Sequence, residues 1–162
     1  MDGALGDACL PAPAPPHLLS PTSLAHLQTT ADRPFRTSKR DGRCLFDQLK
    51  LPAELVPFMG RPPVRVQALV DTGLFTLAEL RRLCPDLHGL SLHSLVFPCS
   101  LVWPMGFAWG SSVAQATMLH VCRAAGLSAD MQLSNSLPTP FGNTAVGLAT
   151  DDVAHLTTSG PE

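Results

Sequence analysis

Two adjacent carboxylates, Asp151 and Asp152, stand between two short apolar segments near the end of the chain. The segments 145–149 and 153–156 have the length and apolar character of strands, which predicts a hairpin with the acidic pair at its tip. Adjacent carboxylates repel each other, and a bound divalent cation offsets that repulsion. The pattern indicates a candidate metal site, and an ordinary acidic turn is the alternative.

A third carboxylate, Asp41, follows a basic cluster made of Arg33, Arg36, Lys39 and Arg40. Clustered cations beside a carboxylate can serve a polyphosphate ligand, although such a run is more often a solvated face. Strand character around Cys44 and Phe46 places Asp41 at the start of a strand. Locally, Asp41 could also be a cap or turn residue, and Phe46 a core residue.

The third informative segment is the bend Pro104-Met105-Gly106-Phe107 and the helix expected after it. Gly106 permits a positive φ or the close approach of another molecule. Ser111 or Ser112 can cap the helix, and Gly126 can end it. Its predicted buried stripe consists of residues spaced four, three and four apart, namely Ala114, Met118, Val121 and Ala125.

Two other segments resemble hydrolase signatures. Asp71-Thr72-Gly73 resembles the active-site loop of retroviral-type aspartic proteases, although Leu74 stands where that family usually has a small residue. Thr76-x-x-Glu79 reads as a capping box, which makes the Asp-Thr-Gly segment a turn before a helix. Residues 110–114 match only half of a nucleophile elbow, because the last position is Ala114.

Composition bounds the class of protein. The 162 residues are 45% hydrophobic and 15% charged, with a formal net charge of -2, which suits a folded domain without the strongly basic character of many nucleic-acid-binding proteins. Five cysteines lack the spacing of a zinc site or a disulfide framework, which favours a reducing compartment. We expect a protein of the cytoplasm or nucleus, because the sequence shows neither a signal peptide nor a transmembrane segment.

The first part of the chain differs from the rest. Prolines recur at close intervals between residues 8 and 34, where they remove backbone donors. We therefore expect residues 1–34 to be a disordered Pro/Ala-rich lead-in and residues 35–162 to form the folded domain.

Taken in order, the three segments resemble motifs A, B and C of the reverse transcriptase palm of a retroelement, over about residues 38 to 158. The matching positions are Asp41-x4-Phe46, then Pro104-x-Gly106-Phe107 with Gln115 and Met118 on the helix, then the apolar-x-Asp151-Asp152 hairpin. The resemblance implies that Asp41 and Asp151 hold two Mg²⁺ (or Mn²⁺) ions and that Asp152 is the third catalytic carboxylate. It also implies a nucleotide-binding role for five residues, namely Gly42, Phe46, Met105, Gly106 and Gln115.

This resemblance implies an α+β, polymerase palm-like fold. A small antiparallel sheet would be backed by the helix over residues 111–125, with the first strand beside the acidic hairpin. The partners would be an RNA or DNA template-primer and a dNTP. Ala149-Thr150 replaces the usual Tyr-x before the acidic pair, and the spacer between the first two motifs is long.

We expect these 162 residues alone not to extend a primer, because the parts that position template and primer would lie in a longer parent chain. Two alternatives stay open. One is a non-catalytic retroelement remnant that at most binds a partner. The other is a retropepsin-like protease that uses Asp71-Thr72-Gly73.

Overall fold

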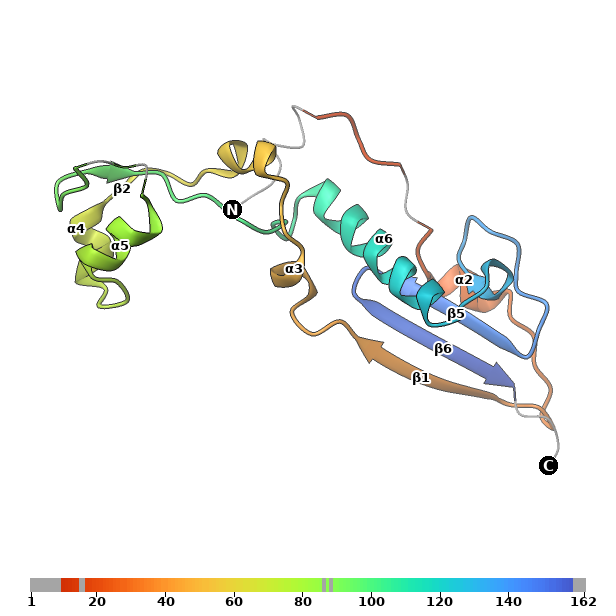
Figure 1. Cartoon of the computed structure of the whole chain (residues 1–162). Coiled ribbons are helices and arrows are strands. Elements are labelled where there is room, and N and C mark those ends of the chain that lie inside the picture. The colour runs from red at the N-terminus through yellow and green to blue at the C-terminus, as the bar shows by residue number, and fades with distance from the viewer. Residues whose placement is uncertain (1–9, 15–16, 86, 88, 159–162) are drawn as a thin grey trace. The chain divides into compact units, whose positions relative to one another are not determined.

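A computed structural model of the chain describes residues 10–14, 17–85, 87 and 89–158. Residues Leu51–Leu101 form one compact unit, and the chain before and after them forms a second unit (Figure 1). The long spacer between the first two sequence motifs is therefore a separately packed insertion. The residues of the second unit that flank the insertion pair with each other: Lys50 bridges Val102, and the Trp103 amide donates to the Leu49 carbonyl at 3.0 Å. We call this pairing the neck.

The second unit is built on a four-stranded sheet with the order β1-β6-β5-β4. Its strands are β1 (Phe35–Asp41), β4 (Gln132–Leu133), β5 (Thr144–Ala149) and β6 (Asp152–Thr158). β6 pairs antiparallel with both β1 and β5, but β4 pairs parallel with β5. The expected all-antiparallel sheet is thus wrong at this edge, because the loop 134–143 carries the chain back before β5 begins. The observed class is α+β with a small mixed sheet.

Both faces of the sheet are covered over β5, which explains why this strand is a nearly continuous apolar run. On one face lies a core cluster of Leu133, Ala145 and Leu156. Val146 and Leu148 alternate with that cluster and are also buried. Helix α6 (Ala108–Ala124) runs along β5 in Figure 1 and supplies the cover for this second face.

The lead-in packs against the sheet from residue 17 onward, in contrast to the predicted disorder. Helix α2 (Pro21–Ala25) follows a capping box at Ser20. The Leu19 amide donates to the Leu148 carbonyl at 2.7 Å, and Leu19 and Leu27 join the core cluster. A Cβ added to Gly147 would lie 2.5 Å from Leu19 Cδ1, so the absence of a side chain on β5 lets Leu19 approach. Residues 1–9 and 15–16 of the predicted lead-in, and residues 159–162 of the predicted domain, lie outside the described residues.

Several predictions about the elements near the site differ from the structure. Residues Leu45–Gln48 form a short helix, α3, where strand character was predicted, and Asp41 ends β1 instead of starting a strand. Helix α6 begins at Ala108, before the predicted serine caps. Its buried positions include Ala114 and Gln115, whereas Val121 is 53% exposed, so the predicted stripe is wrong in its second half.

The unit Leu51–Leu101 has its own small core of Val66, Leu80 and Leu90. Its elements are η1 (Ala53–Met59), β2 (Val64–Arg65), α4 (Val66–Asp71), α5 (Leu77–Leu83) and β3 (Leu95–Val96). β2 and β3 pair antiparallel. The predicted capping box of Thr76 and Glu79 is confirmed at the start of α5.

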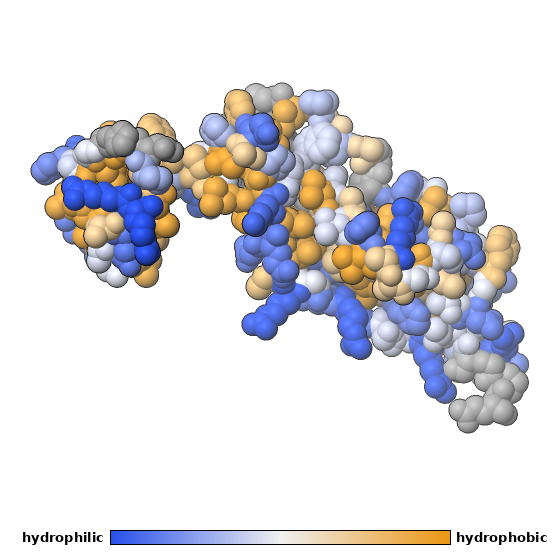
Figure 2. All heavy atoms as spheres, in the orientation of Figure 1, coloured by the Kyte–Doolittle hydropathy of each residue, from blue (hydrophilic) through white to orange (hydrophobic). Residues whose placement is uncertain are grey.

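This unit also leaves large apolar side chains at its surface, which Figure 2 shows as orange areas. The most exposed are Phe58, Leu74, Phe97 and Leu101. So short a segment cannot cover all of its apolar residues. No helix in the described part of the chain is both long and apolar enough to cross a membrane.

Candidate functional site

The strand register places Asp41 directly opposite Asp152. Residues directly opposite each other in an antiparallel pair share a face of the sheet, so both carboxylates project to the same side. Asp152, Ala154 and Leu156 are two residues apart along β6 and therefore share one face of the sheet. This is the face that carries the core cluster, and α6 covers the other face. The two carboxylates therefore lie on the face of the sheet opposite α6, from parts of the chain far apart in sequence.

Asp151 occupies the two-residue turn between β5 and β6, together with Thr150. Thr150 has a φ of 61°, whereas Asp151 does not have a positive φ, a combination for which glycine is favoured at the first turn position. The Gly42 amide donates to the Asp151 carbonyl at 2.8 Å. A Cβ on Gly42 would lie 3.2 Å from that oxygen, so glycine lets the chain after β1 lie close to the turn.

Gln115 reaches the same turn from α6. Its Oε1 accepts a hydrogen bond from the Thr150 amide at 2.8 Å, and its Nε2 donates to the His17 carbonyl at 3.4 Å. The residue is only 5% exposed. The structure thus shows Gln115, predicted to bind nucleotide, as a buried side chain that fixes the turn carrying Asp151.

A cation completes the cluster. Lys39 Nζ lies 2.7 Å from Asp152 Oδ2, with the lysine side chain 67% exposed and that of the aspartate 34% exposed. The hydrogen bond that Lys39 donates to Asp152 and the charge of that carboxylate raise the pKa of Lys39, and the charges of Asp41 and Asp151 add to this effect. The Lys39 ammonium therefore interacts electrostatically with all three predicted metal ligands. Sequence reasoning treated Lys39 only as part of the basic cluster, although its position two residues before Asp41 puts both on one strand face.

The three carboxylates are neighbours, but their side chains do not converge on one point. Within the described ranges, no group of three His, Cys, Asp or Glu side chains is arranged to hold a metal ion. The nearest cation to Asp152 is instead the Lys39 ammonium. Carboxylate oxygens are nonetheless the ligands that Mg²⁺ prefers, and Asp151 is partly exposed.

The remaining predicted nucleotide-binding residues lie on α3 and on the bend before α6. Phe46 is half-buried, and its Cε1 would lie 3.7 Å from a Cβ on Gly110, so the ring packs toward α6. Met105 is 69% exposed, and Gly106 has the positive φ, 82°, that its prediction allowed. No hydrogen bond or ion pair in the described chain links Phe46, Met105 or Gly106 to the three carboxylates.

The hydrolase-like segments have ordinary structural roles. Asp71 ends helix α4, and its Oδ1 accepts from Gln67 Nε2 at 2.6 Å. Thr72 Oγ1 donates to the Leu69 carbonyl at 2.6 Å, which closes the end of the helix. Ser112 lies inside α6 rather than on a turn between a strand and a helix. Neither segment forms the arrangement that its signature requires.

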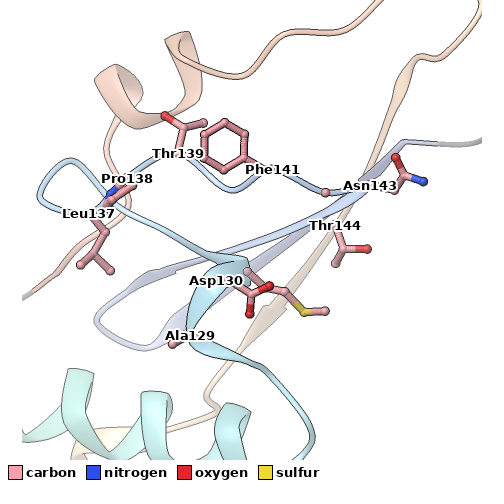
Figure 3. A pocket seen from close by; sticks show the side chains of 10 residues that line it. Ala129, Asp130, Leu137, Pro138, Thr139, Phe141, Asn143 and Thr144 are labelled. Carbon is pink, nitrogen blue, oxygen red and sulfur yellow. The ribbon is translucent and has the colours of Figure 1, made fainter.

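A cavity lies at the other end of β5. It has a volume of about 520 Å³ and is lined by residues from Ala129–Met131 and from the loop 137–144. Figure 3 shows the ring of Phe141, which is 98% exposed, and the carboxylate of Asp130 among these residues. None of the predicted site residues lines this cavity.

Comparison with known proteins gave no relative. No protein-family model, curated protein sequence or solved structure matches this chain.

Proposed function

We propose that the second unit is part of the palm of a retroelement reverse transcriptase, an RNA-directed DNA polymerase. The observation that carries the proposal is the pairing of Asp41 with Asp152 at the tip of the β5–β6 hairpin. The strand order β1-β6-β5 and the helix α6 over β5 are consistent with a palm. An ordinary acidic turn would not require a further carboxylate, here Asp41, from a strand that is distant in the sequence.

In this proposal Asp41 and Asp151 hold Mg²⁺ or Mn²⁺, and Asp152 is the third carboxylate of the site. Two bound cations would lower the pKa of a primer 3′-hydroxyl and neutralise the departing pyrophosphate. The substrates are a template-primer and a dNTP. Gly42, Phe46, Met105 and Gly106 contribute to nucleotide binding, and Phe46 restricts the space at the sugar.

The carboxylate oxygens of these three residues are of the type that Mg²⁺ and Mn²⁺ prefer as ligands. The Lys39 ammonium lies against one carboxylate and is influenced by the other two, so a positive charge is already favoured at this place. Gln115 and Gly42 contribute by holding the turn of Asp151 from two sides. These two contacts fix the backbone of the turn from which the Asp151 carboxylate extends.

The proposal is tested by titrating the full chain with Mn²⁺ and following the free ion by electron paramagnetic resonance. We expect Asp41→Asn and Asp151→Asn each to weaken Mn²⁺ binding about tenfold or more, because affinity follows the number of charged ligands. Asp130→Asn is the matched control, since Asp130 is exposed and lies at the opposite end of β5. Equal binding by all three variants would refute the metal site.

A second measurement separates a polymerase site from a simple cation site. Binding of a fluorescent dNTP to the same chain should require Mn²⁺ and should be lost in Asp151→Asn. Phe46→Ala should bring the affinities for the corresponding dNTP and rNTP closer together. Binding of the dNTP that is indifferent to Mn²⁺ would count against the proposed function.

A non-catalytic remnant of the same domain is the second candidate. The observation that favours it is the Lys39–Asp152 ion pair, which satisfies one carboxylate without any metal. A remnant of this kind would show no dependence on Mn²⁺ in melting temperature or dNTP binding. The protease alternative has no such support, because Asp71 ends a helix.

A further inference from the structure

Lys39 lies beside the acidic face, by which we mean the face of the sheet that carries Asp41 and Asp152. It alternates with Asp41 on β1, so both side chains project to the same face of the sheet. Its partner across the ladder is Ala154, whose methyl group leaves room above β6. The lysine side chain can therefore extend along the strand toward Asp152, where the 2.7 Å contact is made.

We propose that Lys39 is an internal counter-ion that competes with the divalent cation for the carboxylates of Asp41, Asp151 and Asp152. This inference rests on the proposed function, because it concerns the same site. The ammonium neutralises part of the charge in the absence of metal, and it has to leave Asp152 when a divalent cation binds. Lys39 thereby sets the metal concentration at which the site fills.

The exposure of the pair makes this exchange feasible. An ion pair between partly exposed side chains is weak, because water screens it and because the long lysine loses freedom when it is held. Release of the ammonium from Asp152 therefore costs little. A divalent cation brought next to a retained ammonium would be repelled, so the lysine swings into solvent as the metal enters.

The neighbouring residue gives a matched control. Arg40 is also exposed on β1, but it lies opposite Val153 and projects to the other face of the sheet. Arg40→Met changes the net charge of the chain as much as Lys39→Met does, without removing a charge from the acidic face. A difference between the two variants therefore reports the local effect of Lys39.

The experiment is the Mn²⁺ titration of the full chain, with free Mn²⁺ measured by electron paramagnetic resonance. We expect Lys39→Met to tighten binding about three- to tenfold, through removal of a nearby like charge and of the competing ion pair. Arg40→Met should stay within about twofold of the wild type, and so should Lys39→Arg, which keeps a cation on the same face. Circular dichroism of each variant confirms that the fold is retained.

The possible failures are distinct. If the wild type binds Mn²⁺ through Asp151 but Lys39→Met binds no more tightly than Arg40→Met, the counter-ion role is wrong and the proposed metal site stands. If neither the wild type nor Lys39→Met binds Mn²⁺, both the counter-ion role and the proposed function are refuted. Binding gained only in Lys39→Met would support the counter-ion role but would overturn the easy release of the ammonium argued from the exposure of the pair.

Discussion

Replacement of Gln115 by Met should loosen the turn that carries Asp151. Met has a similar length but no strong acceptor, so the Thr150 amide would lose its 2.8 Å hydrogen bond to Gln115 Oε1. Gln115 is buried, so the Thr150 amide that faces it would lose its partner at a cost of about 1–3 kcal/mol. The 3.4 Å bond to His17 is long and adds little. We therefore expect a loss of about 2 kcal/mol in the free energy of unfolding.

For a chain of this size, a loss of about 2 kcal/mol corresponds to a melting temperature lower by about 4–8 °C. Hydrogen exchange gives the local readout, because the Thr150 amide should exchange about 30-fold faster when its protection falls by the same free energy. Gln48→Met is the control: Gln48 Nε2 donates to the Arg43 carbonyl at 2.7 Å, but the residue is exposed. That variant should stay within about 0.5 kcal/mol of the wild type.

This reasoning would be refuted if Gln115→Met had the same melting temperature as Gln48→Met and its Thr150 amide stayed protected from hydrogen exchange. In that case the turn holds its conformation without Gln115. The residue would then be free to serve a ligand, as the sequence resemblance implies. A large loss of stability instead assigns Gln115 to positioning the turn.

Three further results are expected. Gly147→Ala should displace Leu19 from β5, because the new Cβ would lie 2.5 Å from Leu19 Cδ1; we expect a loss of about 1–3 kcal/mol and faster exchange of the Leu19 amide, and an unchanged Leu19 amide would contradict the packing. Thr76→Ala should remove the capping box of α5 at a cost of about 1 kcal/mol, visible as faster exchange of the Glu79 amide, whereas intact protection would show that the cap is dispensable. Hydrogen bonds from the Thr76 amide and hydroxyl lower the pKa of Glu79, so its stabilisation of α5 is complete above the unfolded pKa and is lost as the pH falls through the lower folded pKa. Acid fraying of α5 that persists unchanged in Thr76→Ala would argue against this cause.

Features encoded by local sequence were predictable. The capping box of Thr76 and Glu79 depends on residues three apart, and the structure confirms it. The strands on either side of Asp151 follow from short apolar runs that fit the interior of a sheet. The glycine that ends α6, Gly126, has a φ of 101°, as expected of a residue after a helix.

Features that depend on residues far away in the sequence could not be predicted. Pro-rich composition predicted disorder before residue 34, but Leu19 and Leu27 find an apolar face on the sheet that no local pattern reveals. Cys44–Phe46 has strand-forming residues, yet the chain turns through a positive φ at Cys44 and forms α3. Gln115 accepts a hydrogen bond from the amide of Thr150, which lies 35 positions away in the sequence, and the residues around Gln115 give no sign of that partner.

The neck has a consequence for how this chain can change over evolutionary time. Lys50 and Val102 bridge each other, so the chain leaves the second unit and returns to it at adjacent positions. We therefore expect that lengthening, shortening or exchanging residues Leu51–Leu101 would leave the hydrogen bond between Leu49 and Trp103 in place. A short turn could replace the whole insertion without moving Asp41 relative to the hairpin. The insertion is thus a module free to diversify independently of the residues proposed to bind metal.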